Sequence, residues 1–209
     1  FMTWDRRQGS YDDYLLNLCD LYVKSLIGLD KSAIDFATDQ VIKLKSERVY
    51  TYTRSRIKWH LSQGHKVIFI SGSPDFLVKK MAEKYNLQIH KRCLYNITDY
   101  RGSVYVFEDN AFTGKVIPMW DSVSKNKAID ELVEKHNLDL EKSYAYGDTN
   151  GDINMLRRVG NPIAINPTKE LLLHINQDNT LSKTTKIIVE RKDTIYSLAP
   201  DVEIYKNDL

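Results

Sequence analysis

The chain has 209 residues, of which 42% are hydrophobic, enough for one α/β domain or a core with a small accessory domain. Its 30 basic and 28 acidic side chains leave a formal charge of +2. This balance, with no basic run interleaved with aromatics, argues against a nucleic-acid partner. Apolar runs such as residues 67–70 are too short to span a bilayer. Cys19 and Cys93 match neither a disulfide framework nor a metal-binding pair, so we expect a reducing, cytoplasmic setting.

Residues 10–62 show the patterning of helices. Four side chains recur at the spacing of one helix face: Leu15, Leu18, Cys19 and Tyr22. Asp30 or Ser32 is placed to cap a second helix. A third helix is expected over residues 50–62, because Gly64 is a usual helix stop. No strand alternation interrupts this stretch, which predicts a small helical bundle.

After Gly64 the pattern changes to short apolar runs that alternate with helical segments. Strands are expected at residues 66–70, 87–90, 104–107, 112–116, 143–146, 162–165 and 186–190, with helices over 76–85 and 124–136. The third and fourth of these strands, joined by a turn at 108–110, read as a hairpin. Such alternation predicts a parallel sheet covered on both faces, with ligands beyond the carboxyl ends of its strands. The polar residues that directly follow strands are therefore the site candidates.

The first candidate is the segment Ser-Gly-Ser-Pro at residues 71–74, directly after an expected strand. The Ser71 hydroxyl and free backbone N–H groups, where a strand opens onto a helix, suit a phosphate oxygen. Serine, glycine and proline are also ordinary turn and capping residues. Taken alone, this segment fits an anion site or a plain turn.

The second candidate is the segment Gly-Asp-Thr-Asn-Gly-Asp at residues 147–152. Asp148 and Asp152, four positions apart in a strand-to-helix turn, can face one hard cation through oxygen ligands. The glycines allow the backbone to turn tightly. A loop with an aspartate helix cap is the alternative. An EF-hand is a poor match, because its spaced acidic positions and closing glutamate are absent.

A fixed cation is the third requirement of a site that transfers phosphoryl groups. Lys125 and Lys127 both lie near the start of the expected helix 124–136. A lysine on a helix is usually a solvated surface residue, so the residues alone leave both open.

In combination, a hydrophobic strand followed by Ser71, a later lysine and a strand ending in Gly-Asp-x-x-x-Asp resemble one family. They match motifs two, three and four of the haloacid-dehalogenase phosphatases. The phosphoserine-phosphatase-like branch is the more similar, since it shares the Thr-Gly at 113–114 and the Gly-Asn-Pro-Ile-Ala-Ile-Asn-Pro run at 160–167. The resemblance covers about residues 64–171. It implies an α/β fold with a Rossmann-like parallel sheet and a small helical cap.

The resemblance also implies a role for each candidate residue. Ser71, with the backbone of Gly72, would bind the transferring phosphoryl group. Lys125 would neutralise that group, and it is preferred over the second lysine because its spacing from Asp148 matches the family without a gap. Asp148 would bind Mg²⁺. Asp152 would be an alternate metal ligand or would support the ligand, and we count it among the catalytic residues.

The family's first motif, a strand ending in Asp-x-Asp-x-[Thr/Val], is absent from the sequence. In the family its first aspartate is the nucleophile that forms an aspartyl-phosphate, and the second is the acid/base. The chain starts at Phe1 rather than at methionine, and we expect the motif and its strand to lie upstream. Residues 1–62 would then be the helical cap and residues 63–209 a core without its first strand. The 209 residues alone are expected to be inactive.

The intact protein is thus expected to be a Mg²⁺-dependent hydrolase of a small phosphate ester. Two alternatives stay open: a non-catalytic binding or regulatory protein of the same fold, and a phosphotransferase that passes phosphate to a sugar or alcohol. The sequence does not indicate the substrate or the oligomeric state.

Overall fold

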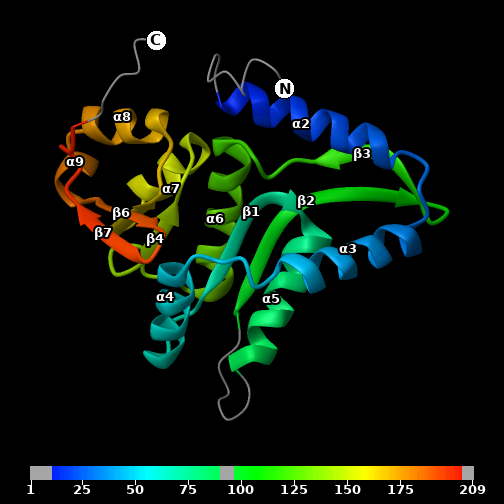
Figure 1. The fold of residues 1–209 in the computed structure, drawn as a ribbon, viewed down its shortest axis with the longest axis horizontal. Helices are drawn as coiled ribbons and strands as arrows, with labels where there is room; N and C mark the ends of the chain where they lie inside the picture. Colours follow the sequence, from blue (N-terminus) through cyan, green and yellow to red (C-terminus); the bar gives the residue numbers. More distant parts are fainter. Residues whose placement is uncertain (1–10, 90–96, 204–209) are drawn as a thin grey trace.

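The computed structural model describes residues 11–89 and 97–203. Its helices are α2 (Tyr11–Leu26), α3 (Lys31–Lys45), α4 (Thr51–Ser62), α5 (Asp75–Ile89), α6 (Ser122–His136), α7 (Ile153–Arg157), α8 (Lys169–Gln177) and α9 (Leu181–Thr184), with a 3-10 turn η1 (Asn150–Asp152). Its strands are β1 (Ile68–Pro74), β2 (Asp99–Glu108), β3 (Ala111–Ile117), β4 (Tyr144–Gly147), β5 (Asn161–Ile165), β6 (Lys186–Arg191) and β7 (Thr194–Leu198). From β1 onward strands and helices alternate, and the fold is of the α/β class (Figure 1). No helix within the described ranges is long and apolar enough to cross a bilayer.

The strands form two sheets. In the first, of order β1-β2-β3, β1 and β2 are parallel and β2 and β3 form an antiparallel hairpin. In the second, of order β4-β5-β6-β7, the first three strands are parallel and β7 is antiparallel to β6. The Rossmann-like parallel arrangement predicted from the sequence is therefore present, but it is split into two sheets. The gap between them separates β1, which carries Ser71, from β4, which precedes Asp148.

Each sheet has its own apolar core. In the second sheet, Leu156 of α7, Ala164 of β5 and Leu171 of α8 are completely buried, because the two helices cover the strand. In the first sheet, Tyr105 and Phe112 of the hairpin are buried in a separate cluster. Burial of such side chains is the main favourable contribution to folding, so each sheet has its own source of stability.

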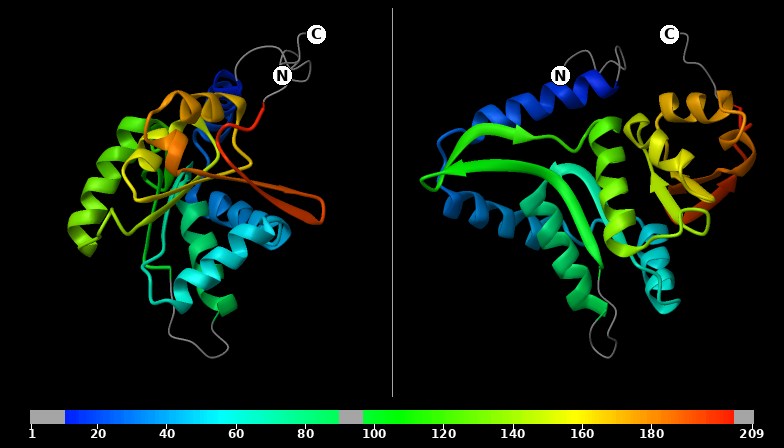
Figure 2. Two further views of the ribbon diagram at one scale, coloured as in Figure 1. Left: turned by 90° about the vertical axis from the view of Figure 1, so that its left-hand side faces the viewer. Right: turned by 180° about the vertical axis from the view of Figure 1, so that it is seen from behind.

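Three helices occupy residues 11–62, as the sequence predicted. Asp30 caps α3, and its side chain accepts a hydrogen bond from the backbone of Ser32, which decides between the two expected caps. The expected bundle is wrong, because α2 and α3 lie along opposite sides of the β2-β3 hairpin (Figures 1 and 2). Ile34 of α3 shares the buried cluster of the hairpin. The aromatic hairpin thus replaces the helix-to-helix contacts that a bundle would have.

The third helix, α4, is anchored on the second sheet. Glu190 of β6 accepts hydrogen bonds from the first two backbone N–H groups of α4, each at 2.8 Å. The Tyr146 hydroxyl of β4 lies 2.7 Å from Nε2 of His60 and accepts a hydrogen bond from Nε of Arg56 at 3.1 Å. Burial and the nearby Arg56 and His65 lower the pKa of His60 to about 4. The imidazole is therefore neutral near pH 7, where Tyr146 holds it in place.

The strand expected at residues 87–90 is wrong. Helix α5 continues to Ile89, and His90 lies outside the described residues. A four-residue apolar run does not separate a strand from the last turn of a helix. Residues 75–86 contain no glycine or proline to end the helix earlier, so the helical pattern persists.

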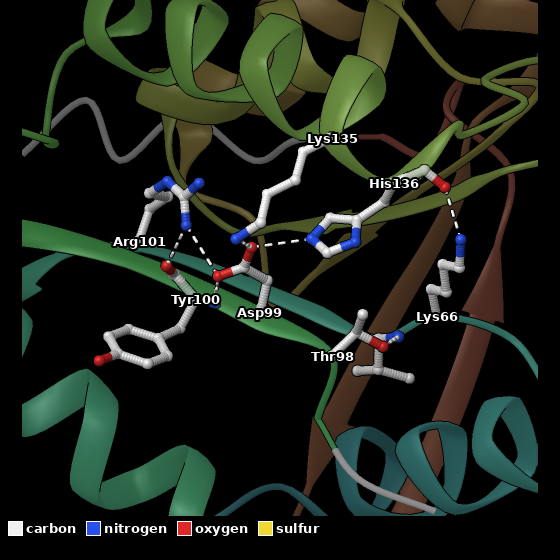
Figure 3. Close-up of polar contacts among 8 residues, drawn as sticks. Lys66, Thr98, Asp99, Tyr100, Arg101, Lys135 and His136 are labelled. Carbon is white, nitrogen blue, oxygen red and sulfur yellow. Dashed lines mark hydrogen bonds and ion pairs between the residues drawn. The ribbon is translucent and has the colours of Figure 1, made fainter.

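A polar cluster joins the start of β2 to the C-terminal end of α6 (Figure 3). The Asp99 carboxylate accepts hydrogen bonds from Arg101 at 2.8 Å and from Lys135 at 2.9 Å. Nε2 of His136 lies 2.8 Å from the same carboxylate, and Lys66 donates a hydrogen bond to the His136 carbonyl. Burial raises the pKa of Asp99, but the hydrogen bonds from His136 and Lys135 outweigh it and hold the pKa well below its ordinary value. The cluster fixes α6 against the first sheet.

We expect Asp99→Asn to lower the free energy of unfolding by about 2 kcal/mol near neutral pH, because charge-assisted hydrogen bonds are lost. Since the pKa of Asp99 is depressed in the folded state, its stabilisation is fully present above the unfolded pKa of about 4. It is lost progressively as the pH falls from there toward the folded pKa. Urea unfolding of both proteins over this pH range measures the difference, which should shrink on acidification.

The control is Asp20→Asn, because Asp20 forms an exposed ion pair with Lys24 at 2.6 Å. It should change the free energy of unfolding by less than about 0.5 kcal/mol. A difference between wild type and Asp99→Asn that stays constant with pH would contradict the assignment.

Candidate active site

The residues predicted as a site lie at the carboxyl ends of β1 and β4 and at the start of α6. Ser71 and Gly72 lie in the last part of β1, and Asp148 directly follows β4. Helix α6 projects between the two sheets in Figure 1 and lies to one side of them in the left-hand view of Figure 2. It carries Lys125 in its first turn. This helix therefore presents a cation beside the loop that follows β4.

The centre of this region is a buried ion pair. Nζ of Lys125 lies 2.6 Å from Oδ1 of Asp152, and each side chain is only 9% exposed. The other carboxylate oxygen, Oδ2, accepts hydrogen bonds from the backbone N–H groups of Asp148 at 3.1 Å and Thr149 at 3.3 Å. The Thr149 hydroxyl is 3.4 Å from the same oxygen. Both oxygens of Asp152 are thus occupied by donors, and the carboxylate fastens the loop after β4 to α6.

Two glycines allow this close packing. A Cβ atom added at Gly147 would lie 2.5 Å from the Cβ of Asp152, a distance at which the two atoms clash. A Cβ added at Gly151 would lie 3.1 Å from the carbonyl oxygen of Trp120 and 3.5 Å from Nζ of Lys125. The sequence pattern Gly-Asp-x-x-x-Asp therefore has a steric basis here, because only glycine leaves room for the buried carboxylate.

Trp120 joins the two predicted segments, and sequence reasoning missed it. A Cβ added at Gly72 would lie 3.0 Å from the Cβ of Trp120. The carbonyl oxygen of Trp120 is also the nearest atom to a Cβ added at Gly151. Ser103, which is completely buried, links the same two segments. Its hydroxyl donates a hydrogen bond to the Gly72 carbonyl at 2.8 Å and accepts one from the backbone N–H of Met119, next to Trp120, at 3.1 Å. Neither residue belongs to a recognisable local motif, and their contacts depend on long-range packing.

The two lysines between which the residues alone did not decide have different surroundings. Lys125 is buried, whereas Lys127 is exposed two positions further along α6. Ser71 is partly buried, and its Oγ accepts a hydrogen bond from the Ser73 backbone at 3.2 Å. The hydroxyl proton of Ser71 can therefore still be donated to a ligand.

Of the two carboxylates in this loop, Asp148 is exposed whereas Asp152 is buried. Partial desolvation and the negative charge of Asp152 raise the pKa of Asp148, while the charge of Lys125 opposes them. Among the described residues no three or more histidine, cysteine or acidic side chains are grouped to hold a metal. Mg²⁺ is commonly bound by one or two carboxylates and otherwise by waters and phosphate oxygens, so Asp148 fits as one such ligand.

Comparison with known proteins places these features in a family context. A family model described as haloacid dehalogenase-like hydrolase matches residues 15–157, a range that includes every predicted site residue. A putative hydrolase of Mycobacterium leprae is 27% identical over 150 residues, which cover 71% of this chain and 44% of that protein. A phosphoserine phosphatase of Mycobacterium tuberculosis is 28% identical over 134 residues, 64% of this chain and 39% of that protein.

The fold is also similar to that of solved structures. A phosphoserine phosphatase, solved as a phospho-aspartyl intermediate analogue, aligns with a TM-score of 0.56 over 84% of this chain and 72% of that chain. The two sequences are 19% identical, so this match shows similarity of fold. The chain spans less than half the length of the two curated relatives.

The buried pair can be tested by a double-mutant cycle with Lys125→Met and Asp152→Asn. Each single change is expected to lower the free energy of unfolding by about 3–5 kcal/mol, because it leaves a buried charge without its partner. The double variant should lose less than the sum of the two, and urea unfolding measures all four proteins. Lys127→Met, at the exposed lysine, serves as the control and should have little effect. Strict additivity of the two single changes would contradict the pairing.

Proposed function

The chain belongs to the haloacid dehalogenase-like hydrolase family, and on this basis we propose that the intact protein is a Mg²⁺-dependent phosphomonoesterase of a small phosphorylated metabolite. The single observation that supports it most is the buried Lys125–Asp152 pair beside the exposed carboxylate of Asp148. A fixed cation next to an open carboxylate at a strand end suits the binding of a phosphate group together with a metal ion. The hydrolase and phosphatase names of the relatives support the same class of reaction.

In this proposal the Ser71 hydroxyl and the Gly72 N–H donate hydrogen bonds to the oxygens of the phosphoryl group. Lys125 neutralises the negative charge that collects there, and its pairing with Asp152 holds the ammonium group in position before substrate arrives. Asp148 would hold Mg²⁺, which supplies further charge neutralisation when bound. For Asp152 we propose a positioning role in place of direct metal binding, because both of its oxygens already accept hydrogen bonds.

The reaction also needs a nucleophile, and the sequence contains no Asp-x-Asp-x-[Thr/Val] segment. We propose that this motif belongs to a segment outside residues 1–209. Its first carboxylate would attack phosphorus to form an aspartyl-phosphate, while its second carboxyl group protonates the departing alkoxide. The same second group would then take a proton from the water that hydrolyses the intermediate. Residues 1–209 alone would therefore bind phosphate esters without turning them over.

The absence of that motif also keeps a second candidate open, a non-catalytic protein that retains the anion pocket. The coding sequence upstream of residue 1 discriminates between them, since the enzyme requires an apolar run ending in Asp-x-Asp-x-[Thr/Val]. A phosphotransferase would instead pass phosphate to a sugar or alcohol. The division into a cap of residues 1–62 and a core of residues 63–209, and the cytoplasmic setting, remain part of the proposal.

The test is a screen of the intact gene product against a panel of phosphomonoesters, with Mg²⁺ and with a chelator. Asp148→Asn is expected to lower Mg²⁺-dependent hydrolysis at least about 100-fold, because it weakens the charge that holds the metal. Asp109→Asn is the matched control, because Asp109 lies in the hairpin turn at a positive φ that asparagine also adopts. Unchanged activity of Asp148→Asn would refute the metal assignment.

The two lysines provide a second test. Lys125→Ala should lower the hydrolysis rate by a similar factor, because it removes the buried cation, whereas Lys127→Ala should leave the rate within about twofold of wild type. Circular dichroism of each variant checks that the fold is retained. The reverse ranking of the two variants would show that the wrong lysine has been assigned.

A further inference from the structure

Two histidines face each other where α4 ends. His60 lies in the last turn of α4, and His65 follows Gly64, three positions before β1 begins. Their Nδ1 atoms are 2.9 Å apart. His60 is 8% exposed, whereas His65 lies at the surface. Neither side chain takes part in the proposed phosphate site, and no carboxylate of the described residues is hydrogen-bonded to either ring.

The backbone at the end of α4 brings the two rings together. The N–H of His65 donates a hydrogen bond to the carbonyl of His60 at 3.0 Å. The N–H of Gly64 donates to the carbonyl of Leu61 at 3.1 Å. With Gly64 at a φ of 73°, these two bonds form the Schellman motif that ends many helices and brings its first and sixth residues into an apolar contact. Here both of those positions are imidazoles, so the backbone sets their spacing.

The buried imidazole is also held at its other nitrogen. Nε2 of His60 lies 2.7 Å from the Tyr146 hydroxyl, which accepts a hydrogen bond from Arg56. A hydroxyl oxygen has two lone pairs, so Tyr146 can accept from Nε2–H as well. In that tautomer Nδ1 of His60 carries a free lone pair on the side of His65. Metal-binding histidines are commonly oriented in this way, with the second ring nitrogen donating to a fixed oxygen.

Burial and charge keep this lone pair available. Burial, Arg56 and His65 lower the pKa of His60 to about 4, so its Nδ1 is unprotonated near pH 7. Arg56 lies on the Nε2 side of the ring, because it binds the Tyr146 hydroxyl, and its guanidinium carbon is 3.9 Å from the ring centroid of Trp59. The C-terminal end of a helix carries partial negative charge. The end of α4 therefore favours a cation on the Nδ1 side.

The ligand type and the spacing indicate which cation fits. Two neutral imidazoles without a carboxylate favour a transition metal over Mg²⁺ or Ca²⁺, which prefer oxygen ligands. Metal–nitrogen bonds of about 2.1 Å place two nitrogens about 3.0 Å apart at a right angle and about 3.4 Å apart at the tetrahedral angle. The observed separation of 2.9 Å is closer to the right-angle value. Right angles are typical of tetragonal Cu²⁺ and Ni²⁺ sites, whereas zinc sites are tetrahedral.

We propose that His60 and His65 form a two-histidine site for Cu²⁺ or Ni²⁺, with water at the remaining coordination positions. The metal takes the place of the Nδ1 proton of His65, which moves to Nε2 of the same ring. The bound ion would tie the end of α4 to the residues before β1 and, through Tyr146, to β4. Binding to the folded state alone would stabilise the protein. The inference does not depend on the proposed hydrolase activity.

The test is a calorimetric titration of the intact gene product, free of any histidine tag, with Ni²⁺ in the presence of excess Mg²⁺. His65→Ala should weaken Ni²⁺ binding at least about tenfold, because one of the two protein ligands is lost. Tyr146→Phe should weaken it about tenfold, because it removes the oxygen that orients His60. His174→Ala is the matched control, since His174 is also exposed and lies outside the pair. It should leave the affinity unchanged.

A spectroscopic measurement reports the ligands directly. The electron paramagnetic resonance spectrum of the Cu²⁺-loaded protein should show hyperfine coupling to two nitrogen ligands, and His65→Ala should lose one of them. Ni²⁺ should also raise the midpoint of thermal unfolding of the wild type but not of His65→Ala. If Tyr146→Phe does not fold, His65→Ala still decides the question, because the replaced side chain is at the surface.

Three results would overturn the inference. The first is equal Ni²⁺ affinity of the wild type and His65→Ala, including no binding to either. The second is an equal loss of affinity in His174→Ala, which would indicate general binding to surface histidines. The third is a Cu²⁺ spectrum that His65→Ala does not change. Each would leave the two rings as a hydrogen-bonded pair that only closes the end of α4. No ester hydrolysis is measured, so these outcomes do not bear on the proposed function.

Discussion

The buried ion pair between Lys125 and Asp152 is the interaction on which the arrangement of the site depends. A carboxylate and an ammonium group that are each 9% exposed are tolerated only as partners, because either one alone would be strongly destabilised by desolvation. The pairing therefore fixes α6 relative to the loop after β4. Because Asp152 also accepts hydrogen bonds from the backbone of residues 148–149, the same contact sets the course of the chain at Asp148.

The sequence predicted those parts of the fold that depend on local pattern. The hairpin is an example, because Asp109 and Asn110 both have the positive φ that a tight turn requires. The strand before Asp148 and the helix that carries Lys125 likewise follow from short apolar runs and a helical period. The extension of α5 to Ile89 was not predictable in this way, since a short apolar run suits either structure.

Long-range packing accounts for what the sequence did not predict about the site. Trp120 and Ser103 have no local pattern, yet their contacts with Gly72 and with the loop after β4 bring two distant segments together. The family resemblance favoured Lys125 over Lys127, but the burial that distinguishes the two lysines depends on a partner 27 positions away, Asp152. The absence of the Asp-x-Asp-x-[Thr/Val] motif was the one indication in the sequence that the sheet is divided. The sequence did not indicate how the two sheets are placed.

The two-sheet arrangement has a consequence for the order in which the protein assembles. Residues 68–117 contain all three strands of the first sheet, and residues 144–198 contain all four of the second. Pairing within each sheet needs only short loop closures, which are the fast steps in folding. The packing of α4 on the second sheet instead joins residues far apart in the chain, since Glu190 binds the first N–H groups of α4 from 139 and 138 positions away, and we expect this contact to form last and to open first under denaturant.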